Sequence, residues 1–357
     1  MAMRIELEDS AETINDYLYK GGMTDGLPVV PPTEARVEAM VRASGLQAGD
    51  ALGEVPPLNN PATVEQLAIN AVMAGCEPRY MPALMATVEA LLDPVFGAHS
   101  VQTTTNPVSP MILFNGPICR ELDINCGAGC FGPGRKANAT IGRALRLIML
   151  NIGGAVPGDI DKAPLGWPGK YNSCCFGENE EDSPWEPYHV EHGFSREDST
   201  VTLIPVNGMW PITETSPDAA MVLHHVTHGM ATTGHSALDY VPEPFQLVLV
   251  MSPVIARMVA EITPKKQALK QHLFDHARIP LDWYPPSRHE DTRRYLAKHN
   301  LRVQDNLIPI AQNPEGFIIL VAGGSGGLQS CGLSTILGHA VTRKIQSSPI
   351  TAQKEDR

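Results

Sequence analysis

The sequence lacks the features that would place the chain in a membrane or on a nucleic acid. It has no run of about 18 apolar residues, which excludes a transmembrane helix. Its first residues, MAMRIELEDSAETI, are charged and contain no apolar segment, so we expect no secretory leader. Because 39 acidic residues outnumber 27 basic ones, the net charge of −12 offers no basic surface to nucleic acid or an anionic membrane. We therefore expect a cytoplasmic protein.

The cysteines lack the spacing of a metal or redox motif. Seven are present, an odd number that favours free thiols in a cytoplasmic protein. Cys126 and Cys130 are separated by three residues, whereas a zinc ribbon or a thioredoxin-like motif needs C-x-x-C. Cys174 and Cys175 are adjacent, and neighbouring cysteines do not easily ligate one metal.

Several catalytic signatures are missing as well. The chain contains neither the phosphate-binding G-x-x-x-x-G-K-[ST] loop nor the dinucleotide fingerprint. The residue after His224 is His225, so H-E-x-x-H is absent. Gly324-Ser325-Gly326 lacks the second spacer of a G-x-S-x-G elbow. The reaction class therefore cannot be assigned from these motifs.

Strand and helix patterns alternate along the chain. We expect strands at 98–104, 111–114, 200–206, 246–251 and 317–322, and helices at 34–43, 64–74, 80–92, 139–151, 218–232, 254–262 and 265–276. This alternation predicts an α/β fold, with mixed α+β as the alternative. The Pro- and Trp-rich stretch 205–217 is the best boundary, which gives two closely packed lobes, 1–204 and 205–357, around a shared cleft.

One segment, residues 123–186, concentrates unusual chemistry. Its glycine-rich loop, GAGCFGPGR at 127–135, offers backbone N–H groups to a ligand. A helix start near Asn138 follows, with Arg135 before it and Thr140 and Arg143 inside it. Helix N-termini and basic side chains attract anions, so these four residues are predicted to bind a carboxylate or phosphate. A tight loop with solvated basic residues is the alternative.

Two cysteines are candidate nucleophiles. Cys130 lies beside basic residues and a helix start, a setting that lowers the pKa of a thiol. Cys174 is the second candidate. The alternative is that both are buried structural thiols.

An acidic turn and nearby histidines are candidates for acid–base or metal chemistry. Glu178 and Glu181 are the predicted acid–base residues, and with His189 they could ligate a divalent metal. A charged surface turn is the alternative. His224 and His228, spaced i, i+4, could extend a metal face, although structural or solvent-facing histidines are the commoner case.

Several blocks of the chain resemble a bacterial family of poorly characterised proteins associated with UGSC-type (seleno)proteins. The blocks are TDGLPVVPPT, ATVEQLAINAVMAGCEPRYMPAL, TTNP, NATIGRALRLIMLNIGGA, PGDIDKAPLGWPGKY, ENEEDSPWEP and VAGG followed by AVTRKI, within residues 24–345. The resemblance implies reductive or nucleophilic cleavage of a carbon–heteroatom bond, together with a redox partner protein. It adds Lys170 and Trp185 to the predicted substrate-binding residues, because both fall in these blocks.

Together these patterns predict an enzyme that acts on a small anionic, carboxylate-bearing molecule. A cysteine thiol and a glutamate acid–base would cleave or reduce a carbon–heteroatom bond, as in a lyase or oxidoreductase. The sequence requires no cofactor, and a divalent metal belongs to the second hypothesis, a hydrolase or lyase with a Glu/His cluster. The third hypothesis is a non-catalytic subunit that binds substrate for a redox partner. A chain of this size and apolar content is also expected to form a homo-oligomer.

Overall fold

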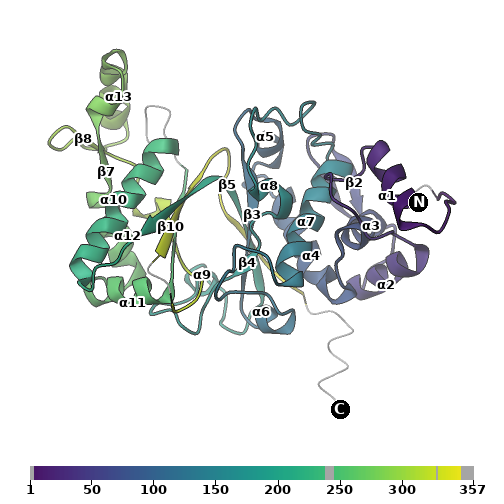
Figure 1. Ribbon diagram of the computed structural model, residues 1–357. Coiled ribbons are helices and arrows are strands. Elements are labelled where there is room, and N and C mark those ends of the chain that lie inside the picture. Colours follow the sequence, from purple (N-terminus) through teal and green to yellow (C-terminus); the bar gives the residue numbers. More distant parts are fainter. Residues whose placement is uncertain (1–3, 238–244, 327–328, 347–357) are drawn as a thin grey trace.

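The computed structural model describes residues 4–237, 245–326 and 329–346, which form a mixed α/β fold as predicted (Figure 1). The helices are α1 (Ala11–Lys20), α2 (Glu34–Ser44), α3 (Val64–Ala74), α4 (Met81–Leu92), α5 (Ala98–Thr103), α6 (Ile118–Glu121), α7 (Lys136–Asn151), α8 (Gly169–Asn172), α9 (Tyr188–Glu191), α10 (Ala219–Ala237), α11 (Pro253–Ile262), α12 (Lys266–His276) and α13 (Pro286–Lys298). The strands are β1 (Ala51–Val55), β2 (Asn60–Thr63), β3 (Ser109–Asn115), β4 (Phe176–Gly177), β5 (Thr200–Thr213), β6 (Leu247–Met251), β7 (Arg278–Pro280), β8 (Leu307–Pro309), β9 (Phe317–Val321), β10 (Gln329–Thr335) and β11 (Val341–Lys344).

Helix α3 shows how closely a local sequence signal can fix a boundary. It begins where the sequence predicts, because the Thr63 side chain accepts from the Gln66 backbone N–H while the Gln66 side chain bonds back to Thr63. It ends at Gly75, which adopts the left-handed conformation with φ +91°.

Residues 98–104 contradict their prediction, since they form helix α5 instead of a strand. The half-polar pattern arises because α5 buries only part of its surface, through Val101 and Gln102 among others.

The main sheet has the same arrangement when read from either edge. Its order is β4-β3-β5-β10-β6-β9, with β11 also paired to β5. In one half, β3 is parallel to β4 on its outer side and antiparallel to β5 on its inner side. In the other half, β6 is parallel to β9 and antiparallel to β10. The two halves meet at the antiparallel pair β5–β10, so the fold repeats one β-α-β unit and the return strand that follows it.

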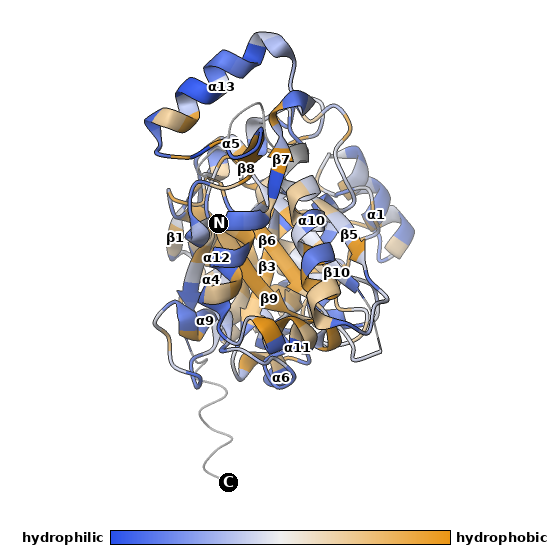
Figure 2. Ribbon diagram, turned by 90° about the vertical axis from the view of Figure 1, so that its left-hand side faces the viewer, coloured by the Kyte–Doolittle hydropathy of each residue, from blue (hydrophilic) through white to orange (hydrophobic). Residues whose placement is uncertain are grey.

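The sheet is packed on both faces. Helices α3, α4 and α7 share one core with β3 and the start of β5, and α10, α11 and α12 share a second core with β6 and β9. In Figure 1 these two helix groups lie on opposite sides of the strands. The other face of the sheet forms a third core, in which side chains of both halves pack together, and Figure 2 shows the apolar strands β3, β6 and β9 at the centre. The sheet must therefore curl to cover its own face.

The predicted boundary between residues 204 and 205 falls inside β5. This strand pairs with β3 over Thr200–Val206 and with β10 over Val206–Thr213. The pairing with β10 shifts register close to Val206, where the strand passes from one half to the other. The two predicted lobes thus share one continuous strand.

Within the described residues, no helix combines the length and the apolar character needed to cross a bilayer.

Candidate functional site

The carboxyl ends of the two parallel strand pairs come together at one place, which we call the junction. The backbone N–H of Asn179, just after β4, donates to the carbonyl of Val321 at the end of β9 (2.8 Å). Nearby, the Gly323 N–H donates to the Cys126 carbonyl (2.8 Å), and a Cβ added to Gly324 would lie 2.8 Å from that of Ala128. The glycine-rich loop, the acidic turn and the glycines after β9 therefore meet here. In open α/β sheets, ligands bind at the carboxyl ends of strands.

Glu178 is the buried acid of the junction, with 2% of its surface exposed. Its Oε2 accepts from Asn115 Nδ2 (2.6 Å) and from the Tyr188 backbone N–H (2.8 Å). Its Oε1 lies 3.9 Å from Lys266 Nζ and has no hydrogen-bond partner among the described residues. Burial raises the pKa of this carboxyl, and the pull of Lys266 in the other direction does not cancel the effect. Glu178 is thus held in place by one oxygen, while the other is buried and lacks a hydrogen-bond partner among the described residues.

Two buried lysines of α12 connect Glu178 to the surface. Lys266 Nζ lies 3.3 Å from Glu191 Oε2, and Lys270 is paired with the other oxygen of Glu191. Lys270 also pairs with Glu315 (3.2 Å), whose side chain is 66% exposed. Burial alone would raise the pKa of Glu191, but the attraction of Lys266 and Lys270 is stronger, so the pKa of Glu191 is lowered. Buried charges are tolerated when they are paired in this way.

A second carboxylate, Glu180, shares the Asn115 side chain with Glu178. Glu180 Oε1 accepts from Asn115 Nδ2 (3.0 Å) and from the Gly116 backbone N–H (2.7 Å). His189 is fully buried, with Nδ1 3.8 Å from the same oxygen, and neither ring nitrogen has a hydrogen-bond partner in the described structure. Unpaired buried polar atoms are uncommon and often mark a functional site.

The predicted metal ligands are not brought together. Glu181 points to the surface, where it pairs with Arg120 (3.1 Å) and is 80% exposed, while Glu178 and His189 are buried. On α10 the ring centroids of His224 and His228 lie 4.4 Å apart, with the ring planes tilted by 57°. Among the described residues, no three His, Cys, Asp or Glu side chains lie together in a way that could hold a metal ion. The geometry therefore does not support the metal-dependent hypothesis.

The predicted anion-binding cations are each paired with a carboxylate. Arg135 Nη1 pairs with Asp123 (2.9 Å), and Lys170 Nζ with both oxygens of Asp161 (2.9 and 2.7 Å). Arg143 forms a two-point pair with Asp25, at 2.8 Å for each contact. The basic side chains of Arg135, Arg143 and Lys170 are thus each engaged in an ion pair within the protein.

The other predicted substrate contacts also have internal roles. Asn138 lies in the first turn of α7 rather than before it, and its side chain bonds both the N–H and the carbonyl of Asn125 and the carbonyl of Cys175. Thr140 Oγ1 donates to the Lys136 carbonyl within the helix. Trp185 is buried in the core beside α10–α12, where its Nε1 donates to the Thr263 carbonyl. The polar groups of these side chains thus bond within the protein.

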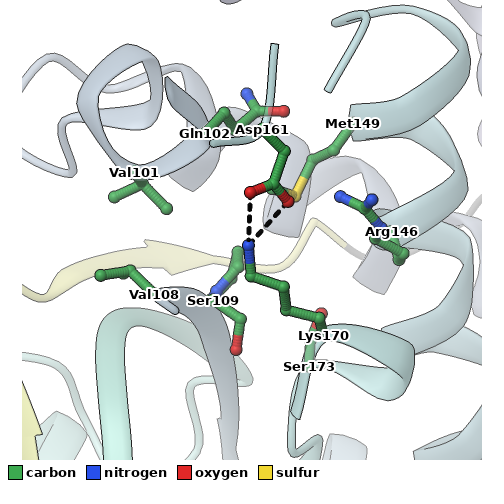
Figure 3. Close-up of a pocket in the computed structure, with 10 residues that line it drawn as sticks. Val101, Gln102, Val108, Ser109, Arg146, Met149, Asp161, Lys170 and Ser173 are labelled. Atoms are coloured by element: carbon green, nitrogen blue, oxygen red, sulfur yellow. Dashed lines mark hydrogen bonds and ion pairs between the residues drawn. The ribbon is translucent and has the colours of Figure 1, made fainter. Parts of the chain in front are cut away.

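Lys170 lines a small cavity next to α7 and α8 (Figure 3). Figure 3 shows its ammonium facing both oxygens of Asp161, with the Arg146 side chain to the right of that pair. Arg146 is 8% exposed and donates to the Ala155 carbonyl. The space of about 10 Å³ is close to the minimum for one water molecule. Lys170 therefore closes a structural cavity that is too small for a substrate.

We expect Asp25→Asn to lower the free energy of unfolding by about 2–3 kcal/mol, because Arg143 would keep its charge in a partly buried position without a counter-ion. Urea denaturation measures the loss. The matched control is Asp123→Asn, which breaks the exposed Arg135 pair and should cost less than about 1 kcal/mol. Equal effects of the two variants would contradict the structural role of Arg143.

The candidate thiols are buried, which is opposite to what a nucleophile needs. Burial raises the pKa of Cys130 to about 11 and that of Cys174 also to about 11. The expected lowering by neighbouring cations is wrong, because Arg135 and Lys136 are paired with Asp123 and Glu77. All seven cysteines, in the part of the chain that the structure describes, are free thiols.

We expect iodoacetamide at pH 8 to label Cys130 and Cys174 far more slowly in the native protein than in urea. With a pKa of about 11, about one thiol in a thousand is ionised at that pH, and each thiol is also shielded. Mass spectrometry of the labelled peptides gives the two rates. Native labelling as fast as in urea would restore these thiols as nucleophile candidates.

Asn115 and Lys266 are junction residues that the sequence analysis missed. Asn115 directly follows the predicted strand 111–114, and a polar residue at the carboxyl end of a buried strand is a detectable signal. Lys266 and Lys270 share a helical face with Leu269 and Leu273, and all four are buried. Two lysines on the apolar face of an amphipathic helix are a second detectable signal.

Comparison with protein-family models gives no match, and none of the curated proteins matches the chain.

Proposed function

We propose that this chain is an enzyme in which Glu178 acts as the general acid–base on a small organic molecule at the junction. The observation that carries the proposal is the Glu178 carboxyl itself. It is buried, its pKa is raised, one oxygen is fixed by Asn115 and Tyr188, and the other has no hydrogen-bond partner among the described residues. Carboxyls with these properties at the carboxyl ends of strands are typical of acid–base catalysts.

The reaction that suits this geometry is cleavage of a carbon–heteroatom bond. Protonated Glu178 donates its proton to the leaving heteroatom as the bond breaks, and the bonding electrons go to that heteroatom. Lys266 then offsets the negative charge left on Glu178. In a hydrolysis, water attacks the carbon and gives a proton back to Glu178. In an elimination, a neighbouring C–H bond breaks and its proton goes to Glu178.

The raised pKa supports the acid role in particular. A carboxyl of ordinary pKa, about 4.3, is almost fully ionised near pH 7, whereas a raised pKa retains a larger protonated fraction. The free thiols suit the reducing cytoplasm, where we propose that the reaction takes place. The proposal needs no thiolate from Cys130 or Cys174.

The test is a turnover screen with the purified chain against small molecules that carry a carbon–oxygen, carbon–nitrogen or carbon–sulfur bond next to a carboxylate or carbonyl. We expect kcat/KM to fall as pH rises through the raised pKa of Glu178, because the protonated form is the active one. Turnover that rises over the same range would overturn the acid role. Turnover only after a redox partner protein is added would favour the substrate-binding subunit that the family resemblance also implies.

A further inference from the structure

A second cavity lies on the outer side of the first half of the fold, between α2, α3 and the start of α7. Its volume is about 260 Å³, slightly below the range of about 300–1,000 Å³ typical of pockets for drug-sized ligands. None of its lining residues belongs to the junction. The lining residues are Val30, Arg36, Ala39, Met40, Val72, Gly75, Cys76, Pro78 and Lys136.

The apolar part of the lining is built into the core. Met40 and Val72 are 2% and 3% exposed, so the helices behind them hold this surface in place. Both belong to the same core as α3, α4 and α7. Val30, which also lines the cavity, is 38% exposed, so a ligand that covers it would remove apolar area from water, which favours a compact apolar body.

The polar part of the lining is positively charged. Arg36 and Lys136 both line the cavity, and Arg36 uses Nη1 to donate to the Pro31 carbonyl (2.9 Å). Lys136 is paired with Glu77 (3.1 Å), a carboxylate shared with Arg79 (2.8 Å). Two cations, Lys136 and Arg79, thus pair with the single carboxylate of Glu77, and Arg36 adds a further positive charge to the cavity, in a chain whose net charge is −12. The Lys136 pair is 56% and 34% exposed, and exposed pairs are weak enough to exchange for a ligand.

We propose that this cavity binds a small organic carboxylate with a compact apolar body. The carboxylate contacts Arg36 and Lys136, and the body lies against Val30 and the small exposed parts of Met40 and Val72. The Arg36 guanidinium supplies the planar donor fork that matches a carboxylate. Inorganic phosphate could pair with the two cations but would leave the apolar surface exposed to water. The apolar body therefore distinguishes the proposed organic carboxylates from inorganic anions.

The proposal is tested by titrating the purified chain with benzoate and with isovalerate, followed by NMR chemical shifts or calorimetry. The neutral amides benzamide and isovaleramide are the matched ligands. We expect at least one carboxylate to bind tenfold or more tightly than its amide, because only the carboxylate pairs with the cations. Equal binding of acid and amide, or binding of neither acid at 10-millimolar concentrations (on the order of the weakest useful affinities), would overturn the proposal.

Two arginines of α2 provide the matched protein variants. Arg36→Met should weaken carboxylate binding by about tenfold, whereas Arg42→Met, which removes the exposed partner of Glu38 on the same helix, should leave it unchanged. Equal losses in both variants would refute the site. Glu178→Gln should bind the carboxylate as the wild type does, so the cavity and the proposed acid–base role can fail independently.

Discussion

Glu178→Gln is expected to lower kcat by about 10²–10⁴ without lowering the melting temperature. Glutamine keeps the shape of the side chain, and its carbonyl oxygen can accept the two hydrogen bonds from Asn115 and the Tyr188 N–H. It cannot donate and recover a proton as a carboxyl does. Steady-state kinetics and thermal unfolding of the same samples separate the two effects.

The pH dependence of stability gives this variant a second signature. The pKa of Glu178 is higher in the folded chain than in the unfolded chain. The protonated carboxyl therefore stabilises the fold fully at a pH below the unfolded-state pKa, and this stabilisation is lost as pH rises through the folded-state pKa. Glutamine does not titrate. The difference in melting temperature, variant minus wild type, should therefore increase as pH is raised from 4.

Glu181→Gln is the matched control for turnover. Glu181 belongs to the same acidic turn, yet its carboxylate is 80% exposed and pairs only with the exposed Arg120 among the described residues. We expect unchanged kcat and unchanged stability. If Glu181→Gln loses activity while Glu178→Gln keeps it, the assignment of the acid–base residue is wrong.

Gly142→Ala is expected to lower the free energy of unfolding by about 3 kcal/mol or more, which reverses the usual sign of this substitution inside a helix. Alanine in place of glycine in a helix normally stabilises by about 1 kcal/mol. At position 142 of α7, however, an added Cβ would lie 1.8 Å from the carbonyl oxygen of Asn172 and 3.1 Å from Cys175 Cβ. The backbone would have to move, and overpacking of this kind is costly.

Urea denaturation measures this effect, with Gly49→Ala as the control. Gly49 is exposed, and an added Cβ there meets no atom within 4 Å, so we expect a change within about 0.5 kcal/mol. A Gly142→Ala variant as stable as wild type would mean that α7 and the end of α8 pack less closely than the structure shows.

The sequence identified the segments of the junction better than the partners of its charged residues. Apolar periodicity predicted α3, and apolar runs predicted β6 and β9. The glycine-rich loop and the acidic turn, which composition alone singles out, do lie close together at the junction.

Pairing between charged groups could not be predicted, because it depends on contacts between distant parts of the chain. Asp25 comes from the N-terminal segment to neutralise Arg143, and Lys266 comes from the other half of the fold to approach Glu178. The same limit explains why the pKa of Cys130 was predicted in the wrong direction. Local basic residues suggest a low pKa, while the third core, which only the curled sheet creates, raises it.

The palindromic strand order has a consequence for the symmetry of the junction. The two β-α-β units and their return strands are arranged as two copies in a symmetric dimer would be. Neither half covers its inner face alone, since that face is buried by the other half. The halves differ at their equivalent strand ends, where one carries Glu178 after β4 and the other carries glycines after β9. A pseudo-symmetric strand order thus holds an asymmetric junction, with the acid supplied by one half and close backbone approach by the other.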